Sequence, residues 1–242
     1  MAEVSSITRI GTSEPFELQV ARGQVAYHEV RNIFGTNPSV GTSFVTAWEV
    51  SGALPFLAAE QLLSLVSTSA SDTAVSILVV GVNQDYTLVS EVVTLNGTTP
   101  VSTTQKFFRI NDLITVSGNA VGDVTASYSA VVYAKILAGY GRNQASVFTV
   151  PAGFGFFLNR IDAFTATANN DTKIMTFRNR VTYSDGRIFN VAQTSFVSRM
   201  DIIRQYPFKV PEKATIEFQV KMSSNTADIG VFGEGVLLRE TV

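Results

Sequence analysis

The chain contains no cysteine and only one histidine, His28, among its 242 residues. Without cysteine there is no disulfide, no thiolate zinc site, no iron–sulfur cluster and no cysteine nucleophile. A serine triad or a histidine metal site would depend on His28, yet the sequence has no Gly-x-Ser-x-Gly motif and no second histidine. His28 falls in a predicted strand, where a hydrogen-bonded structural side chain is expected. The sequence therefore predicts no catalytic residue, no cofactor and no metal site.

Charged residues are also scarce, at 16% of the chain with a net charge of −2, against about 25% in an ordinary globular protein. This balance provides no basic patch for nucleic acid or an anionic membrane. The chain has 17 Phe, 7 Tyr and 1 Trp, but stacking on single-stranded nucleic acid would need a basic groove around them. A surface poor in charge suits a subunit covered by neighbours, although many β-sandwiches share this composition.

Long apolar runs are missing as well. The longest, at 77–82 and 154–158, are far shorter than a membrane-spanning helix requires. Residues 1–13 are polar and carry Glu3 and Arg9, unlike a secretory signal peptide. We therefore expect synthesis in a cytoplasm, no signal peptide and no membrane partner.

Acidic residues occur singly. Two neighbouring carboxylates could act as the acid and base of a glycosidase, but most of the acidic residues stand near turn signals, where aspartate bonds its own backbone. Possible calcium loops at 83–85 and 169–171 lack a complete ligand spacing. The scattered acidic residues are Asp85, Glu91, Asp112, Asp123, Asp162, Asp171 and Asp185, several of them at turns, and the turn interpretation is favoured over a catalytic pair.

Strand patterns are frequent where helix signals are few. Thr215–Met222 alternates apolar and polar residues, so one face is expected in the core and the other in water. Residues 174–183 alternate similarly, and the β-branched run 73–82 is predicted to be buried on both faces. Further strands are predicted at 24–30, 44–50, 86–95, 99–109, 112–116, 124–136, 144–150, 156–165, 188–196 and 229–238.

Two segments have specific local signals. Asn96-Gly97 predicts a hairpin between the strands at 86–95 and 99–109, because a type I′ turn needs positive φ at both central positions. Residues 54–67 are ambiguous: Pro55 could begin a helix over 56–65. A loop or a short turn of helix, followed by a strand, is favoured, because the segment runs directly into a polar turn at 68–72.

Turn signals every eight to twelve residues predict sandwiches or barrels. A flexible joint at 138–141 (AGYG) divides the pattern. We therefore predict an all-β chain of two β-sandwich, jelly-roll-like domains at 15–137 and 142–242, preceded by an N-terminal arm at 1–14. A single large sandwich is the alternative.

Several segments carry a resemblance to a known group of proteins. The chain resembles small virion proteins of marine tailed bacteriophages, including those that infect cyanobacteria, over most of residues 31–161. The matching segments are turns and strands, so no active site comes with them, and residues 54–65 depart from the pattern. They are 31–38 (RNIFGTNP) with 48–49 (WE), 69–73 (SASDT), 91–101 (EVVTLNGTTPV), 107–111 (FFRIN), 132–136 (VYAKI) and 148–153 (FTVPAG).

The resemblance implies a non-enzymatic virion component of β-sandwich type. The first hypothesis is a capsid decoration, or cement, protein that binds copies of itself, by family analogy as a trimer, and the major capsid protein. The second is a tail, collar or fibre-associated adaptor in contact with the host surface. The third is a virion enzyme that degrades glycans. Exposed aromatic residues near turns are expected at interfaces: Tyr140, Phe154 and Tyr206.

Overall fold

The computed structural model describes residues 14–165 and 174–240. This part of the chain holds a short helix, α1 (Phe16–Ala21), and sixteen strands, and the prediction of an all-β chain is confirmed. The strands are β1 (His28–Val40), β2 (Val45–Thr46), β3 (Gln61–Ser67), β4 (Ser76–Val82), β5 (Leu88–Thr94), β6 (Val101–Phe107), β7 (Arg109–Ser117), β8 (Val124–Tyr128), β9 (Val131–Ile136), β10 (Val147–Thr149), β11 (Phe154–Thr165), β12 (Met175–Thr182), β13 (Ile188–Phe196), β14 (Arg199–Val210), β15 (Thr215–Met222) and β16 (Ala227–Arg239).

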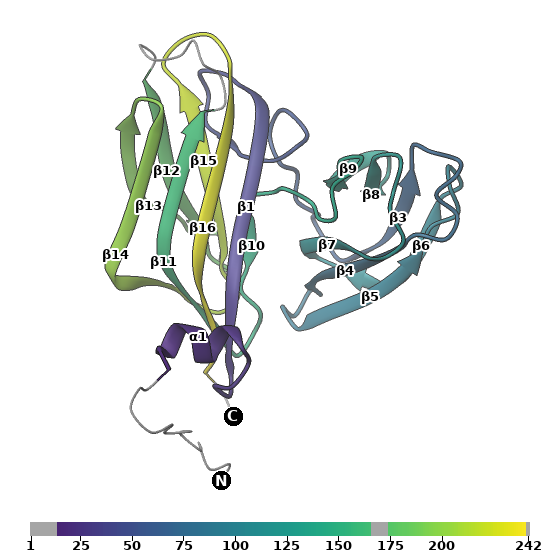
Figure 1. Cartoon of the computed structure of the whole chain (residues 1–242), viewed down its shortest axis with the longest axis horizontal. Helices are drawn as coiled ribbons and strands as arrows, with labels where there is room; N and C mark the ends of the chain where they lie inside the picture. Colours follow the sequence, from purple (N-terminus) through teal and green to yellow (C-terminus); the bar gives the residue numbers. More distant parts are fainter. Residues whose placement is uncertain (1–13, 166–173, 241–242) are drawn as a thin grey trace.

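The larger sandwich is a jelly roll, which we call the jelly-roll domain (Figure 1). Sheet A has the strand order β1-β16-β11-β14, and sheet B has the order β10-β15-β12-β13, with β2 also paired to β15. Counting β1 and β10 to β16 as strands one to eight, the two sheets read 1-8-3-6 and 2-7-4-5. This is the order that two Greek keys wound into a jelly roll produce.

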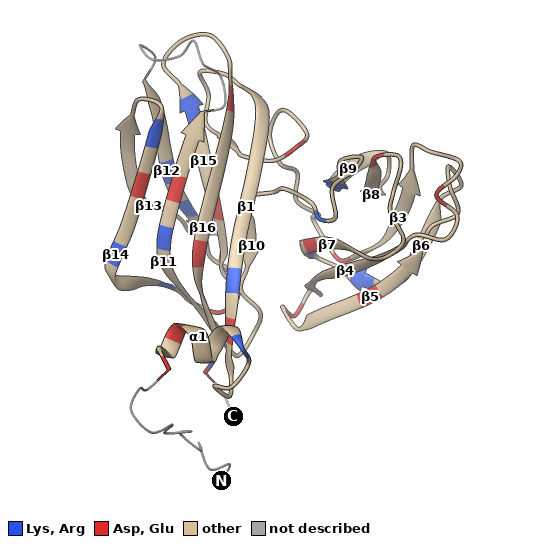
Figure 2. Cartoon of the chain, in the orientation of Figure 1, with Lys and Arg blue, Asp and Glu red and all other residues tan. Residues whose placement is uncertain are grey.

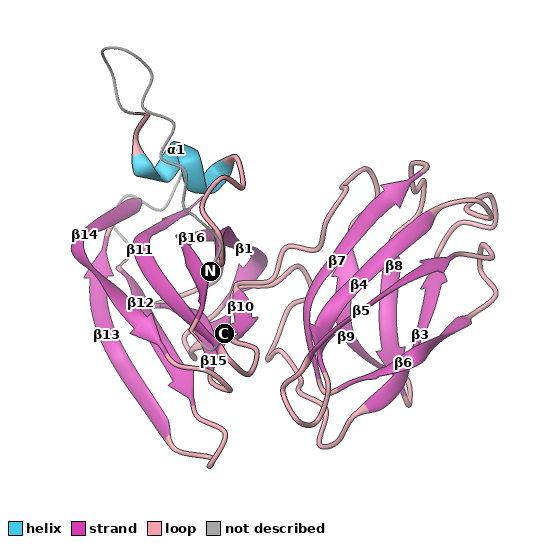
Figure 3. Cartoon of the chain, turned by 90° about the horizontal axis from the view of Figure 1, so that it is seen from below, coloured by secondary structure: helices cyan, strands magenta, loops and turns pink. Residues whose placement is uncertain are grey.

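Strands β3 to β9 form a smaller sandwich, the inserted domain, which enters the chain between β2 and β10. Its sheets have the orders β6-β3-β8-β9 and β5-β4-β7, so it does not repeat the jelly-roll order. Each sandwich encloses its own apolar core. Figure 3 shows the two sandwiches side by side, with α1 at one end of the jelly-roll domain.

The predicted domain boundaries are wrong for the N-terminal part. β1 pairs with β16 and β2 pairs with β15, so the start of the chain belongs to the same sandwich as its end. The joint at 138–141 does lie where the chain leaves the inserted domain. The first joint, between β2 and β3, contains Gly52 at a φ of 93° but was not predicted as a boundary. Residues 1–13 of the predicted arm and Asp171 lie outside the described residues.

The alternation of β15 builds the jelly-roll core. Ile216, Phe218 and Val220 are fully buried between the sheets. The opposite face was predicted to be wet, but Glu217 and Gln219 are buried as well. Their polar atoms are satisfied locally, because Thr46 donates to Glu217 at 3.2 Å and Arg178 donates to Gln219 at 2.8 Å.

The predicted hairpin at Asn96-Gly97 is wrong: Gly97 has a positive φ of 59°, but Asn96 does not have the positive φ that a type I′ turn also requires. β5 and β6 belong to different sheets, so the turn carries the chain across the inserted domain. Glu91 of β5 links the two sheets, because its carboxylate accepts hydrogen bonds from the backbone N–H groups of Thr104 at 2.9 Å and Gln105 at 2.8 Å. In the ambiguous segment the favoured reading is confirmed, because β3 begins at Gln61 and residues 54–60 contain no helix.

Within residues 14–165 and 174–240 no helix has the length and apolar character needed to cross a bilayer. Charges of both signs are interspersed over both domains, without a large region of one sign (Figure 2).

Candidate interaction surfaces

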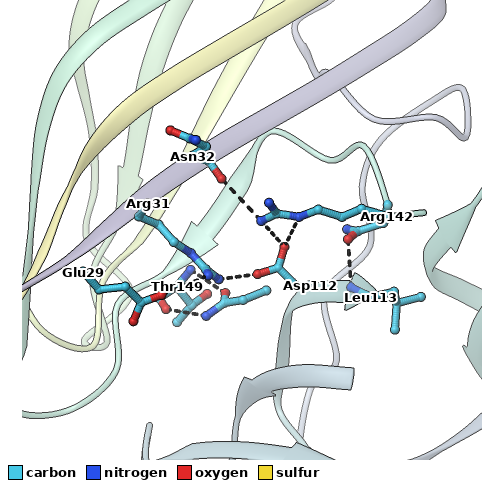
Figure 4. A network of polar contacts seen from close by, with 9 residues as sticks. Glu29, Arg31, Asn32, Asp112, Leu113, Arg142 and Thr149 are labelled. Carbon is cyan, nitrogen blue, oxygen red and sulfur yellow. Dashed lines mark hydrogen bonds and ion pairs between the residues drawn. The ribbon is translucent and has the colours of Figure 1, made fainter. Parts of the chain in front are cut away.

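The two domains meet at a polar junction centred on Asp112 of β7 (Figure 4). The carboxylate of Asp112 is only 3% exposed and is paired on both oxygens. Arg31 of β1 donates to one oxygen, and Arg142, in the linker before β10, donates to the other through Nε at 2.7 Å. The guanidinium of Arg31 also lies 4.8 Å from the ring centroid of Phe148. A single carboxylate thus joins the first strand of the jelly-roll domain, the linker and the inserted domain.

Two asparagines extend the junction on either side of Asp112. Asn111 donates to the carbonyl oxygen of Thr149 at 2.9 Å and accepts the N–H of the same residue at 2.8 Å. Asn143 accepts the N–H of Leu113 at 2.8 Å and donates its own N–H to the carbonyl oxygen of Leu113 at 3.1 Å. β7 and the segment that enters β10 are therefore joined both by a short backbone bridge, Ile114 with Arg142, and by these two side chains.

The junction also has an apolar part around Trp48. Trp48 is buried with Ala145 and Val147, and its indole N–H donates to the carbonyl oxygen of Gly52 at 3.1 Å. Gly35 of β1 allows the close approach, because a Cβ atom there would collide with the backbone of Ala47.

Glu49 lies next to Trp48 and is 7% exposed. One carboxylate oxygen accepts the N–H of Gln144 at 3.1 Å, and the other has no hydrogen-bond partner within the described part of the chain. Burial raises the pKa of Glu49 to about 7, and the hydrogen bond offsets this effect only in part. The junction therefore contains a carboxyl group that changes charge near neutral pH.

The junction encloses a cavity of about 280 Å³ lined by Arg31, Asp112, Tyr140 and Arg142, among others. The charged groups around this cavity pair with one another. Among the described residues no three acidic or histidine side chains are grouped so that they could hold a metal ion. The geometry of the junction is that of a structural joint.

A second candidate surface lies on the opposite flank of the jelly-roll domain, where β13 and β14 form the outer edges of the two sheets. Five large apolar side chains are exposed here, and Ile203 at 76% and Tyr206 at 79% are the most accessible. We call this flank the open side. Its exposed apolar residues are Ile188, Phe189, Val197, Ile203 and Tyr206.

The three aromatic residues predicted at interfaces lie in three different places. Tyr206 is on the open side, whereas Tyr140 lines the junction cavity with half of its surface exposed. Phe154, at the start of β11, packs against the jelly-roll core. The structure does not bring them together.

His28 begins β1 and lies with its ring edge toward Phe16 of α1, with the ring centroids 5.7 Å apart. Its Nδ1 atom is 2.8 Å from the carbonyl oxygen of Ala26. A mainly apolar hollow of about 480 Å³ lies beside it, between α1 and sheet A. The structural role expected for His28 stays a prediction.

Sequence reasoning placed Asp112 and Asp162 in predicted strands but missed their pairing. Both lie inside strands, and both are buried and paired with arginine. A signal was present for Asp112, because a charged residue inside an apolar strand must find a partner. The identity of the partner arginine, 81 residues away in the case of Arg31, had no counterpart in the sequence.

No protein-family model and no curated protein matches this chain. Three solved structures share limited similarity with it. A structure of infectious bursal disease virus, Gt strain, is 9% identical to this chain with a TM-score of 0.23, and the match covers 93% of this chain and 78% of the other. A structure of the Gx strain is 10% identical with a TM-score of 0.25, and the match covers 93% of this chain and 77% of the other. The VP2 subviral particle of the same virus is 10% identical with a TM-score of 0.21, over 90% of this chain and 78% of the other. TM-scores this low do not establish a common fold, so the jelly-roll assignment rests on the strand order.

Proposed function

We propose that this chain is a non-enzymatic structural subunit of a bacteriophage particle and acts as a capsid decoration, or cement, protein. The observation that carries the proposal is the open side, where Ile203 and Tyr206 project into solvent beside two strand edges. Large apolar side chains exposed beside strand edges suit a protein interaction site. The resemblance to virion proteins of marine tailed bacteriophages points to a particle as the place of that interaction.

The junction supports this function mechanically. A subunit that spreads load across a capsid has to transmit force between its own domains. The bonds of Asp112, Asn111 and Asn143 tie the inserted domain to the jelly-roll domain at several points. A standard protein interface buries about 1,600 Å², and a decoration protein repeats such an interface over many copies. The partners in this proposal are other copies of the chain and the major capsid protein.

The test is the copy number of the chain in purified particles, measured by quantitative mass spectrometry. A decoration protein is expected at a copy number comparable with that of the major capsid protein. A copy number far below it would overturn the decoration role and indicate a tail, collar or fibre-associated component. Absence from the particle, or release of reducing sugar from host glycans by the purified chain, would overturn the proposal as a whole.

A matched pair of variants tests the surface. The double variant Ile203→Ser/Tyr206→Ser is expected to reduce incorporation into particles, because it removes apolar contact area from the open side. The control Val92→Ser/Val121→Ser removes two exposed apolar side chains from the inserted domain and is expected to leave incorporation unchanged. Equal incorporation of both variants would contradict the assignment of the open side.

A further inference from the structure

The hollow beside His28 has the size and lining of a small-molecule site. It lies between α1 and the outer face of sheet A, at the end of the jelly-roll domain where α1 stands (Figure 3), and has a volume of about 480 Å³. Small-molecule sites typically enclose about 300 to 1,000 Å³ and combine apolar walls with a few polar groups. We call it the α1 hollow. Its apolar walls include Phe16, Val20, Val30, Phe157, Val236 and Leu238.

The strand register orders the lining along sheet A. Val30 of β1 lies opposite Val236 of β16, and this apolar pair forms the middle of the α1 hollow. His28 lies opposite Leu238, two residues further along β16. Glu234 lies two residues away in the other direction and also lines the hollow. The α1 hollow therefore has an apolar middle with a polar group at each end.

A β-bulge adds an amide at the end marked by Glu234. Leu158 of β11 pairs with Gly235 and Arg160 pairs with the adjacent Glu234, so Asn159 is an extra residue in the strand. Bulges re-aim side chains, and the side chain of Asn159 lines the α1 hollow. Its Oδ1 atom is buried and has no hydrogen-bond partner within the described part of the chain. A buried acceptor without a donor is unfavourable, so this end favours a ligand that donates a hydrogen bond.

The charges around the α1 hollow are negative. Glu17 and Glu234 line it, whereas no lysine or arginine does so among the described residues. Arg160 lies opposite Glu234 in the ladder. However, Arg160 donates to both carboxylate oxygens of Asp201, at 3.0 and 2.8 Å, and is therefore engaged away from the hollow. The lining offers acceptors and negative charge to a ligand, but no cationic group of its own.

His28 agrees with this polarity. Its Nδ1 atom lies 2.8 Å from the carbonyl oxygen of Ala26, which can only accept, so Nδ1 carries the hydrogen. In the neutral ring Nε2 is then an acceptor. The edge-to-face contact with Phe16 fixes the ring against α1. An anionic ligand would find no charged partner at either end.

We propose that the α1 hollow binds a small amphipathic ammonium compound. Its ammonium group donates to Asn159 and Glu234, and its apolar body lies over Val30, Val236 and Phe157 below α1. This inference goes beyond the proposed function and does not depend on it. The ligand is assigned by complementarity, because the walls are apolar while the polar lining is made of acceptors and carboxylates.

Three probes of equal chain length test the ligand class: decylamine, decanol and decanoate. Each is titrated into the full chain in a calorimeter, below the concentration at which it forms micelles. Decylamine is expected to bind at one molecule per chain and at least about tenfold more tightly than decanol or decanoate. Absence of decylamine binding, or decanoate binding of equal affinity, would overturn the inference.

A matched pair of variants tests the position of the ammonium group. Glu234→Gln is expected to weaken decylamine binding by about tenfold and to leave decanol binding unchanged, because only the ammonium group uses the charge. Glu29→Gln removes a carboxylate that is 64% exposed and does not line the α1 hollow, and it should leave both affinities as in the native chain. An equal effect of the two variants on decylamine would contradict the proposed site.

A filling substitution tests the apolar part. Val30→Trp occupies the middle of the α1 hollow and is expected to abolish binding of both decylamine and decanol. Thermal unfolding establishes whether this variant is folded, and the Glu234→Gln comparison decides the question if it is not. Native affinity in a folded Val30→Trp chain would show that the probes bind elsewhere.

A peptide competitor tests the other possible occupant. Residues 3–12 of the chain (EVSSITRIGT) combine apolar side chains with one arginine. A synthetic peptide of this sequence is expected not to displace decylamine from the full chain. Displacement would assign the α1 hollow to a protein segment and overturn its assignment to a small molecule.

Discussion

Asn111 of the inserted domain and Thr149 of β10 exchange two hydrogen bonds, of 2.9 and 2.8 Å, across the boundary between the two domains. Both residues are buried. The amide of Asn111 supplies a donor and an acceptor in the spacing of a neighbouring strand, so the edge strand β10 is completed by a side chain. Together with Asp112, this exchange makes the junction a defined interface.

Removing the central carboxylate should weaken the junction. Asp112→Ala leaves the largely buried Arg31 without this partner, whereas Arg142 is 44% exposed and can be solvated, so the cost should lie below the about 3 to 5 kcal/mol of a fully buried pair. The loss should appear in urea unfolding, together with faster proteolysis of the linker at 137–146. Asp201→Ala removes an exposed carboxylate that pairs with Arg160 and should change stability little. Similar losses in the two variants would contradict a special role for Asp112.

Glu49 should make stability depend on pH. Its pKa is about 7 in the folded protein and 4.5 when exposed, so between these values the folded form holds a proton that the unfolded form has released. The free energy of unfolding should therefore fall as the pH rises from about 4.5 to beyond 7, by at most about 3 kcal/mol. Urea unfolding at several pH values measures the slope.

Glu49→Gln should remove that fall and be more stable than the native chain above pH 7, because it cannot become charged. The exposed Glu17 provides the control, and Glu17→Gln should retain the native pH dependence. A slope unaffected by Glu49→Gln would show that another group is responsible.

A buried amide in the jelly-roll core offers a stabilising substitution. Asn179 of β12 is fully buried, and neither its nitrogen nor its oxygen has a partner within the described part of the chain. An unsatisfied buried polar group costs about 1 to 3 kcal/mol, so Asn179→Leu, of similar shape, should raise the free energy of unfolding by an amount in that range. Thermal unfolding detects it. Asn119→Leu on the surface should give no such gain, and destabilisation by Asn179→Leu would indicate that the amide has a role in the core.

The strand content could be predicted because it depends on alternation within a few residues. β15 shows this best: Ile216, Phe218 and Val220 are core residues, as the pattern predicted. The Asn96-Gly97 signal was equally local, yet the hairpin that it predicted is absent from the described residues. Positive φ at Gly97 specifies the turn, but the sheet that each flanking strand joins depends on distant strands.

The sequence by itself determined that the chain is all-β, that β13 is uncharged and that no cysteine is available. These properties are carried by composition and by the period-two pattern of single strands. The tertiary structure alone decided that β1 pairs with β16, that the inserted domain interrupts the jelly roll, and that Asp112 meets Arg31 and Arg142. It also decided that β13 lies at an edge. The physical reason is that strand pairing joins residues up to about two hundred positions apart. The partner of a strand is selected by packing in three dimensions, and no local sequence pattern specifies it.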